Sequence, residues 1–87
     1  MNKLFSDIAW EHYQYWIVND KKILKRINEL IRDIERNGNA GIGKPEPLKN
    51  ELSGFWSRRI TDIHRLIYCI DGENIYIAKC KSHYNAK

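Results

Sequence analysis

The sequence lacks the features that place a protein in or across a membrane. Its longest uninterrupted apolar run covers residues 66–70, far fewer than the roughly 20 residues that a membrane-spanning helix needs. The N-terminal segment MNKLFSDIAWEH reaches charged residues too early for a secretory signal peptide. The sequence therefore predicts a soluble, cytoplasmic protein without a membrane partner.

Cysteine is scarce, and the spacings that mark common metal or cofactor sites are missing. Cys69 and Cys80 do not have the spacing of metal ligands, and in a cytoplasmic protein we expect both to be reduced packing residues. The sequence also contains no zinc-ligand pattern, no glycine-rich loop that cradles phosphate and no nucleophile elbow. These absences predict a protein that uses neither a metal nor a cofactor.

The chain is short and basic. Its 87 residues can close a single core, so we expect one domain over residues 1–87, with residues 85–87 as a flexible tail. A core of this size is marginal, which favours a homodimer or a bound partner. The net charge is +4, and residues 44–87 hold eight Lys and Arg against five Asp and Glu. This surplus favours an anionic partner such as nucleic acid or an acidic peptide.

Apolar residues recur at helical spacing in the N-terminal half. Ser6 can cap a first helix, and Asn19-Asp20 interrupts it. The apolar face of this helix consists of Ala9, Tyr13, Trp16 and Ile17. Asp20 can cap a second helix that ends at Asn37-Gly38. Its periodic apolar residues are Ile23, Ile27, Leu30, Ile31 and Ile34.

The spacing changes to a period of two after residue 54. Residues 55–60, 64–70 and 75–81 predict three strands, joined by turns at 61–63 and 71–74. Residues 2–5 are a candidate for a short leading strand, whereas residues 37–54 are too irregular for an element. This order predicts an α+β fold in which two N-terminal helices pack on a small antiparallel β-sheet, with a C-terminal three-stranded meander. The other sheet face is free to act as a working surface.

Glu46 lies between two prolines in the segment GKPEPLK, and these prolines stiffen the chain around it. A hydrated loop charge is the simpler interpretation, and a group held still to accept a proton is the functional one. The cations that accompany it are Lys44, Lys49, Arg58, Arg59 and Arg65. They form either a solvated strand face or a phosphate site. Arg58 and Arg59 are adjacent, so a regular strand points them to opposite faces.

Histidine and aromatic residues complete the candidate set. His83-Tyr84 follows the last predicted strand, whereas His12 and His64 receive no catalytic role. Phe55 and Trp56 suit the core or helix packing better than base stacking. A carboxylate, a histidine and several cations suit metal-free RNA cleavage, in which a 2′-hydroxyl attacks the neighbouring phosphorus. That reaction needs a base for the hydroxyl proton, an acid for the departing 5′-oxygen and cations for the phosphorane.

The segments GIGKPEPLKNELSGFWSRRITDIHRLIY and DKKILKRINELIRDI, with the His-Tyr pair near the end, resemble the YoeB family. The members of this family are the toxins of YefM–YoeB toxin–antitoxin pairs, within the RelE-like superfamily. The resemblance runs from the first predicted strand through Tyr84, with the motifs in order and at similar spacing. It implies a small antiparallel sheet flanked by two helices, in agreement with the periodicity.

The resemblance implies a ribosome-dependent mRNA endonuclease that cuts the codon exposed in the A site of the 70S ribosome. By position, Glu46 corresponds to the general base, His83 to the general acid and Arg65 to the group that stabilises the phosphorane. The supporting residues, which bind phosphate or position RNA, are Lys44, Lys49, Arg59 and Tyr84. The chain departs from the family at Asn85-Ala86-Lys87, which follow the His-Tyr pair.

The resemblance also implies partners. The family typically forms homodimers and is neutralised by a YefM-like antitoxin, whose C-terminal segment wraps the toxin and covers or disturbs its catalytic residues. Two alternatives stay open: a ParE-like toxin that binds DNA gyrase without cutting RNA, and a nonenzymatic RNA-binding module. The pairing of Glu46 with His83 favours the endonuclease, because the ParE relatives lack this acid–base pair.

Overall fold

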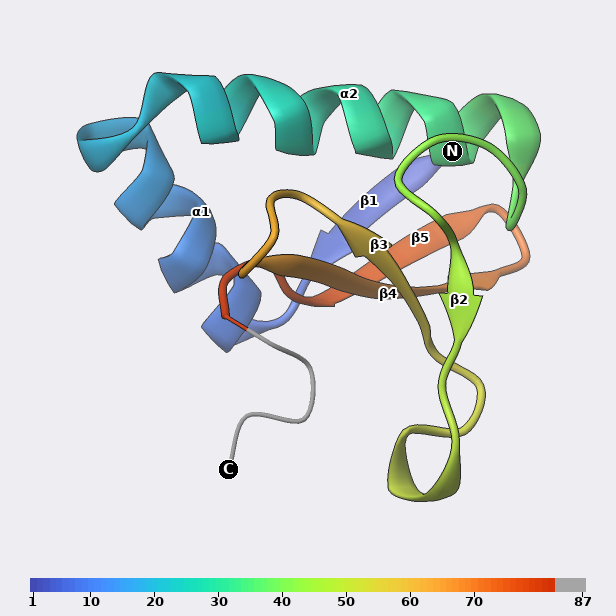
Figure 1. Ribbon diagram of the computed structural model, residues 1–87. Coiled ribbons are helices and arrows are strands. Elements are labelled where there is room, and N and C mark those ends of the chain that lie inside the picture. The colour runs from blue at the N-terminus through green and yellow to red at the C-terminus, as the bar shows by residue number, and fades with distance from the viewer. Residues whose placement is uncertain (83–87) are drawn as a thin grey trace.

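The structure is a computed structural model that describes residues 1–82. It begins with a strand and two helices: β1 Asn2–Phe5, α1 Asp7–Asn19 and α2 Lys21–Asn37 (Figure 1). The remaining elements are β2 Glu46–Pro47, the short 3-10 helix η1 Asn50–Leu52, β3 Trp56–Arg59, β4 Arg65–Asp71 and β5 Asn74–Lys79. None of the helices within residues 1–82 is both long and apolar enough to cross a membrane.

Both helices begin and end where their capping residues predict. The Ser6 hydroxyl accepts a hydrogen bond from the Ala9 amide and caps α1. The Asp20 carboxylate accepts from the amides of Lys22 and Ile23 and caps α2 in the same way. Gly38 ends α2 with a φ of +63°, a conformation that glycine adopts without steric cost.

The strands form one mixed sheet in the order β1-β5-β4-β3-β2. The antiparallel ladders β3–β4 and β4–β5 confirm the predicted meander. Two features differ from the antiparallel sheet that was predicted. β1 pairs with β5 in parallel, which periodicity cannot reveal because a strand's pattern does not identify its partner. In addition, β2 lies in the segment predicted to be irregular, since two residues are too few to show a period.

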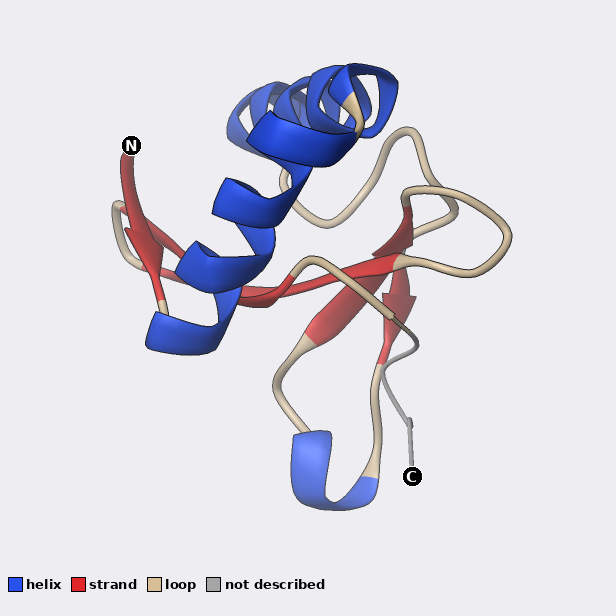
Figure 2. Cartoon of the chain, turned by 90° about the vertical axis from the view of Figure 1, so that its left-hand side faces the viewer, coloured by secondary structure: helices blue, strands red, loops and turns tan. Residues whose placement is uncertain are grey.

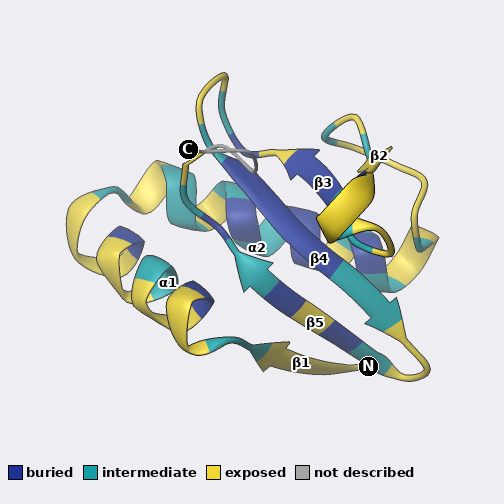
Figure 3. Cartoon of the chain, turned by 90° about the horizontal axis from the view of Figure 1, so that it is seen from below, coloured by how far each residue is buried: buried dark blue, intermediate teal, exposed yellow. Residues whose placement is uncertain are grey.

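The helices cover one face of the sheet and leave the other face open (Figure 2). The core lies between them and includes Ile27, Leu30 and Ile34 of α2, Leu66 and Tyr68 of β4, and Ile75 and Ile77 of β5. In the view from below, buried positions lie in the middle of β3, in the first half of β4 and at alternate positions of β5, whereas the loop around η1 is largely exposed (Figure 3). The α+β architecture predicted from the sequence is therefore confirmed, and it leaves a sheet face for a site.

The cysteines are packing residues. Both thiols are free, and Cys80 is fully buried in the core cluster, where its Sγ lies 3.6 Å from the Ala9 carbonyl. Burial raises the pKa of Cys80 to about 12, so the thiol stays protonated at neutral pH. Cys69 is half-buried in β4, and burial raises its pKa as well.

Candidate active site

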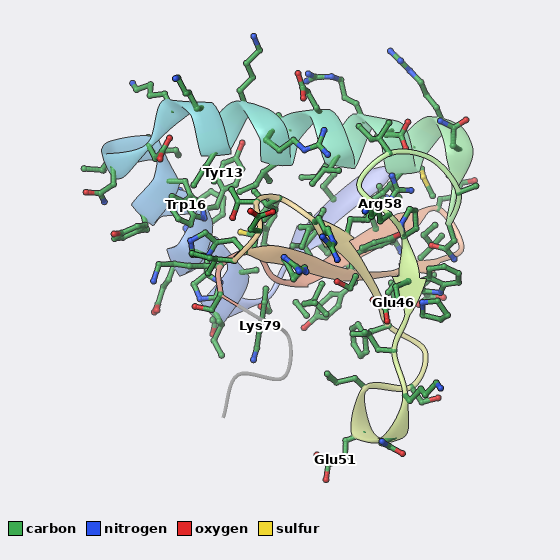
Figure 4. The ribbon with its side chains drawn as sticks, in the orientation of Figure 1. Tyr13, Trp16, Glu46, Glu51, Arg58 and Lys79 are labelled. Carbon is green, nitrogen blue, oxygen red and sulfur yellow. The ribbon has the colours of Figure 1, made fainter. Side chains whose placement is uncertain are left out.

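The register of the sheet brings several of the predicted residues to its open face. One row of paired residues crosses four strands of the sheet. In strand order it consists of Glu46 of β2, Ser57 of β3, Ile67 of β4 and Lys79 of β5. Residues directly opposite in antiparallel strands point to the same face. Figure 4 shows Lys79 pointing away from the helices. A carboxylate therefore stands at the β2 end of this row and an ammonium group at its β5 end.

Two arginines occupy the next position along the strands. Arg59 of β3 lies directly opposite Arg65 of β4, and each is two residues from the row just described, so both belong to the open face. Arg59 is exposed, whereas Arg65 is only 8% exposed. The Arg65 Nη1 donates to the carbonyls of Thr61 at 2.8 Å and Asp62 at 3.2 Å, so the β3–β4 loop holds this guanidinium.

The segment that carries Glu46 is held by a backbone hydrogen bond on each side, and before Glu46 the Gly43 carbonyl accepts from the Arg59 amide at 2.7 Å. The Leu48 amide donates to the Phe55 carbonyl at 2.9 Å, which closes the loop around η1. Glu46 and Lys49 are exposed and share a hollow of about 290 Å³ with Pro47, Leu48 and Asn50. Lys44 is exposed at the entry to this segment. Glu46, Lys44 and Lys49 are therefore accessible to a ligand that lies on this part of the molecule.

Arg58 does not belong to this surface. Its side chain lies on the helix side of the sheet (Figure 4) and is fully buried, where it pairs with Asp33 of α2. The other partners of its guanidinium are the carbonyls of Gly38, Ala40 and Ile42 and the Tyr68 hydroxyl. The hydrogen bond from Arg58 holds the pKa of Asp33 below its ordinary value of 3.8. Arg58 thus joins β3 to α2 and to the 38–42 loop, which corrects its inclusion in a possible phosphate site and confirms that Arg58 and Arg59 face opposite sides.

The C-terminal candidates, His83 and Tyr84, lie outside the described residues, as does the predicted tail 85–87. The structure does place the residue before them. The Ser82 carbonyl accepts a hydrogen bond from the Arg65 amide at 3.1 Å, and the Ser82 amide donates to His64 Nδ1 at 2.7 Å. The last described residue is therefore anchored where β4 begins.

The open face also contains residues to which the sequence assigned no role. Ser57 and Lys79 stand in the same row as Glu46. Alternation within β3 could have identified Ser57, whereas Lys79 lies opposite Ile67 only because the register shifts between Ile67 and Tyr68. Tyr76 lies opposite Cys69, with its ring centroid 6.3 Å from that of Phe55. Phe55 therefore contacts this face, whereas the half-buried Trp56 packs against the core as predicted.

A metal site is not evident in this region. Within residues 1–82, no group of three or more His, Cys, Asp and Glu side chains is arranged to hold a metal ion. The groups that gather on the open face are one carboxylate, two guanidiniums and an ammonium. This set can accept a proton and bind an oxyanion, which is the chemistry of an anionic ligand that bears an ionisable hydroxyl.

Comparison with known proteins identifies the family. The family described as "YoeB-like toxin of bacterial type II toxin-antitoxin system" matches residues 5–84. Toxin YoeB of Escherichia coli strain K12 is 52% identical over 84 residues, which cover 97% of this chain and 100% of that protein.

Solved structures give the same result. The toxin chain of the YoeB–YefM complex from Staphylococcus aureus superposes with a TM-score of 0.91 at 53% identity, covering 97% of this chain and 98% of that one. A structure of the YoeB dimer from the same organism superposes with a TM-score of 0.91 at 54% identity and the same coverage. The chain therefore belongs to the YoeB-like toxin family of bacterial type II toxin–antitoxin systems.

Proposed function

We propose that the chain is a ribosome-dependent mRNA endonuclease that cuts the codon in the ribosomal A site without a metal ion. The observation that carries the proposal is the sharing of one open sheet face by Glu46, Arg59 and Arg65, next to the point where Ser82 leads into His83. Family membership supports the same assignment. Cleavage would stop translation, and the proposed location is the cytoplasm.

The chemistry requires four roles. Glu46 removes the proton from the 2′-hydroxyl, which attacks the adjacent phosphorus. Arg65 stabilises the negative charge of the phosphorane, because its planar guanidinium matches the phosphate oxygens and does not lose its proton. His83 protonates the departing 5′-oxygen. Lys44, Lys49, Arg59 and Tyr84 bind phosphate or support the scissile nucleotide.

The position of Arg59 directly opposite Arg65 supports the proposal that this face binds an anionic ligand. Like charges directly opposite each other across a strand pair are destabilising. A phosphodiester bound between them would replace this repulsion by two charge-assisted interactions. The repulsion between the two arginines is therefore relieved when RNA is bound, which fits an RNA-binding surface.

The partners of relatives support two further proposals. YoeB of Staphylococcus aureus has been solved in complex with YefM and as a dimer. We propose that this chain likewise forms a homodimer and is silenced by a YefM-like antitoxin. An acidic antitoxin segment that neutralises Arg59 and Arg65 would compete with mRNA for the open face.

The test is cleavage of a defined mRNA on programmed 70S ribosomes, read by primer extension. Glu46→Gln and His83→Gln are expected to lower the cleavage rate by about 10²–10⁴-fold each, the usual contribution of a general base or acid. Glu51→Gln is the matched control, since Glu51 is another exposed carboxylate of the same loop and points away from the sheet (Figure 4). Cuts that persist at the wild-type rate in both site variants would refute the proposal. A parallel supercoiling assay with gyrase tests the ParE-like alternative, and salt-sensitive RNA binding without products would indicate a nonenzymatic module.

A further inference from the structure

Two histidines hold the chain segment that leads to the candidate acid. The Cys80 amide donates to His12 Nδ1 at 3.2 Å, and the Ser82 amide donates to His64 Nδ1 at 2.7 Å. The Trp16 indole, from α1, donates to the Cys80 carbonyl at 2.9 Å. Residues 80–82 are therefore attached to α1 and to the start of β4 by side chains that the catalytic scheme does not use.

His64 performs this role as a hydrogen-bond acceptor. An imidazole nitrogen that accepts a hydrogen bond carries no proton, and an imidazolium has two donors and no acceptor. The bond to Ser82 therefore exists only when His64 is neutral with its proton on Nε2. The ring is held edge-on by Trp16, with centroids 4.8 Å apart. In this orientation Nδ1 lies 2.7 Å from the Ser82 amide nitrogen.

The surroundings of His64 favour its neutral form. Burial is the main cause that lowers the pKa of His64 below the ordinary 6.5, and the nearby cations Lys81 and Arg65 lower it further. His12, on α1, also lies close enough for each charge to disfavour the other. Lys81, Arg65 and His12, the charged groups within residues 1–82 that affect His64, therefore all lower its pKa.

The backbone at Ser82 is held in an uncommon conformation. Its φ is +68°, in the left-handed region that a serine rarely adopts. Its amide is bound by His64 and its carbonyl by the Arg65 amide, at 3.1 Å. Backbone strain of this kind persists where the surroundings over-determine the conformation, and such places are concentrated at functional sites.

We propose that His64 is a positioning residue for RNA cleavage: its neutral Nδ1 fixes Ser82 beside Arg65, at the point from which the chain leads to the proposed acid His83. This inference rests on the proposed function and deepens it. Two histidines of one site then need opposite protonation states, since His83 must hold a proton to donate and His64 must lack one to accept. Acidification that protonates His64 would release Ser82 and cost activity.

Two substitutions of His64 separate positioning from packing. His64→Phe keeps an aromatic edge against Trp16 but has no acceptor, so single-turnover cleavage is expected to fall by about tenfold to 100-fold, as for an ångström-scale misplacement of a catalytic group. His64→Asn places an amide oxygen near the former Nδ1 and cannot gain a proton. Its single-turnover cleavage rate is expected to stay within about threefold of the wild-type rate. The decline of this rate at acid pH that His64 causes should also disappear. In both variants the KM for programmed ribosomes is expected to change little.

His12→Phe is the matched control, because it removes an acceptor from the same segment but two residues further from the acid. Its cleavage rate is expected to exceed that of His64→Phe by about fivefold or more. Equal rates for His64→Phe and His64→Asn, or for His64→Phe and His12→Phe, would overturn the inference. So would a loss that appears in KM alone, or one explained by unfolding in a thermal melt.

A spectroscopic measurement distinguishes this inference from the proposed function. In the wild-type protein the Ser82 amide proton should resonate downfield and move upfield as His64 gains a proton. The same signal should be shifted upfield at all pH values in His64→Phe and should not titrate with pH in His64→Asn. If this pattern holds but no RNA is cut, the proposed function fails while the anchoring of Ser82 stands. If RNA is cut but the Ser82 signal ignores His64, the proposed function stands and the inference fails.

Discussion

At the scale of single residues, Arg58 and Arg59 illustrate how one step along a strand changes the environment of a guanidinium. Arg58 enters the layer between sheet and helices, where a buried charge is costly unless it is paired and hydrogen-bonded. It meets this requirement with the Asp33 carboxylate and with carbonyls of the 38–42 loop. Arg59 remains exposed and opposite Arg65. The first arginine therefore stabilises the fold and the second is available for a ligand.

Removal of Arg58 should destabilise the protein strongly. Arg58→Met is expected to lower the free energy of unfolding by about 3–5 kcal/mol, because it leaves Asp33 without its buried partner and several carbonyls without a donor. Arg59→Met, the control, is expected to change it by about 0.5 kcal/mol or less. Urea denaturation followed by circular dichroism measures both. Similar losses in the two variants would contradict the structural role of Arg58.

At the scale of elements, the connection from α2 to β2 depends on one glycine. Gly43 has a φ of +81°, and a Cβ at this position would lie 2.7 Å from Leu30 Cδ2 and 3.3 Å from Arg58 Cβ. The Arg59 amide also donates to the Gly43 carbonyl at 2.7 Å. The segment before Glu46 thus passes close to the core and to β3, which holds β2 in register.

Gly43→Ala should combine backbone strain with overpacking. The left-handed conformation costs about 1–2 kcal/mol for alanine, and the clash adds about 1–3 kcal/mol. Gly54→Ala is the matched control, since Gly54 has a φ of +97° and nothing within 4 Å of an added Cβ. It should show the strain alone. Thermal melts of both variants provide the comparison, and equal shifts in the melting temperature would show that the contact with Leu30 is relaxed at no cost.

The C-terminal segment should make stability depend on pH. The pKa values of His12 and His64 lie below the ordinary 6.5, in both cases chiefly through burial. As the pH falls below 6.5, these histidines take up protons in the unfolded chain before they do so in the folded one, so the free energy of unfolding decreases. Above 6.5 their contribution is fully present.

The measurement is a series of melting temperatures between about pH 7.5 and about pH 5. His64→Asn and His12→Asn should each flatten the acid side of the curve relative to wild type, because neither asparagine titrates. If the melting temperatures of both variants fall with pH in parallel with those of the wild type, the two histidines do not cause the pH dependence. Asp33 acts in a separate range: its lowered pKa adds stability that is lost only as the pH falls below 3.8.

The elements were largely predictable because local chemistry determines them. The caps at Ser6 and Asp20 and the period of α2 are local signals, and the structure confirms them. The meander was also visible as alternating residues between turns. The parallel pairing of β1 with β5 could not be predicted, because it depends on contacts between segments that are distant in sequence. Strand β2 could not be predicted either, because two residues are too few to show a pattern.

At the scale of the whole molecule, the candidate site unites segments that are far apart in sequence. The prolines and the family motif indicated Glu46, but only the sheet register places it in one row with Ser57 and Lys79. The burial of Arg58 could not be derived from the sequence either, because its partner Asp33 lies on another element. Sequence indicates which groups are candidates for such a site, whereas their neighbours require the fold.

Removal of residues 83–87 should separate folding from activity. The core residues and the strands of the described sheet all lie within residues 1–82, so a chain that ends at Ser82 is expected to melt within about 4 °C of the full-length protein. It should not cleave RNA, since the proposed acid is absent. A chain that ends at Cys80 also loses both hydrogen bonds of Ser82 and should melt lower. Failure of the chain ending at Ser82 to fold would show that residues 83–87 are part of the core structure.

The parallel pairing of β1 with β5 also determines when in biosynthesis the sheet is complete. Among the described elements β1 is synthesised first, and β5, the strand to which it bonds, is synthesised last. A nascent chain therefore exposes an unmatched strand until β5 has been synthesised, and it lacks Lys79 and Ser82 until the same stage. The activity that we propose would thus arise only after β5 and Ser82 have left the ribosome, so shorter nascent chains would be inactive.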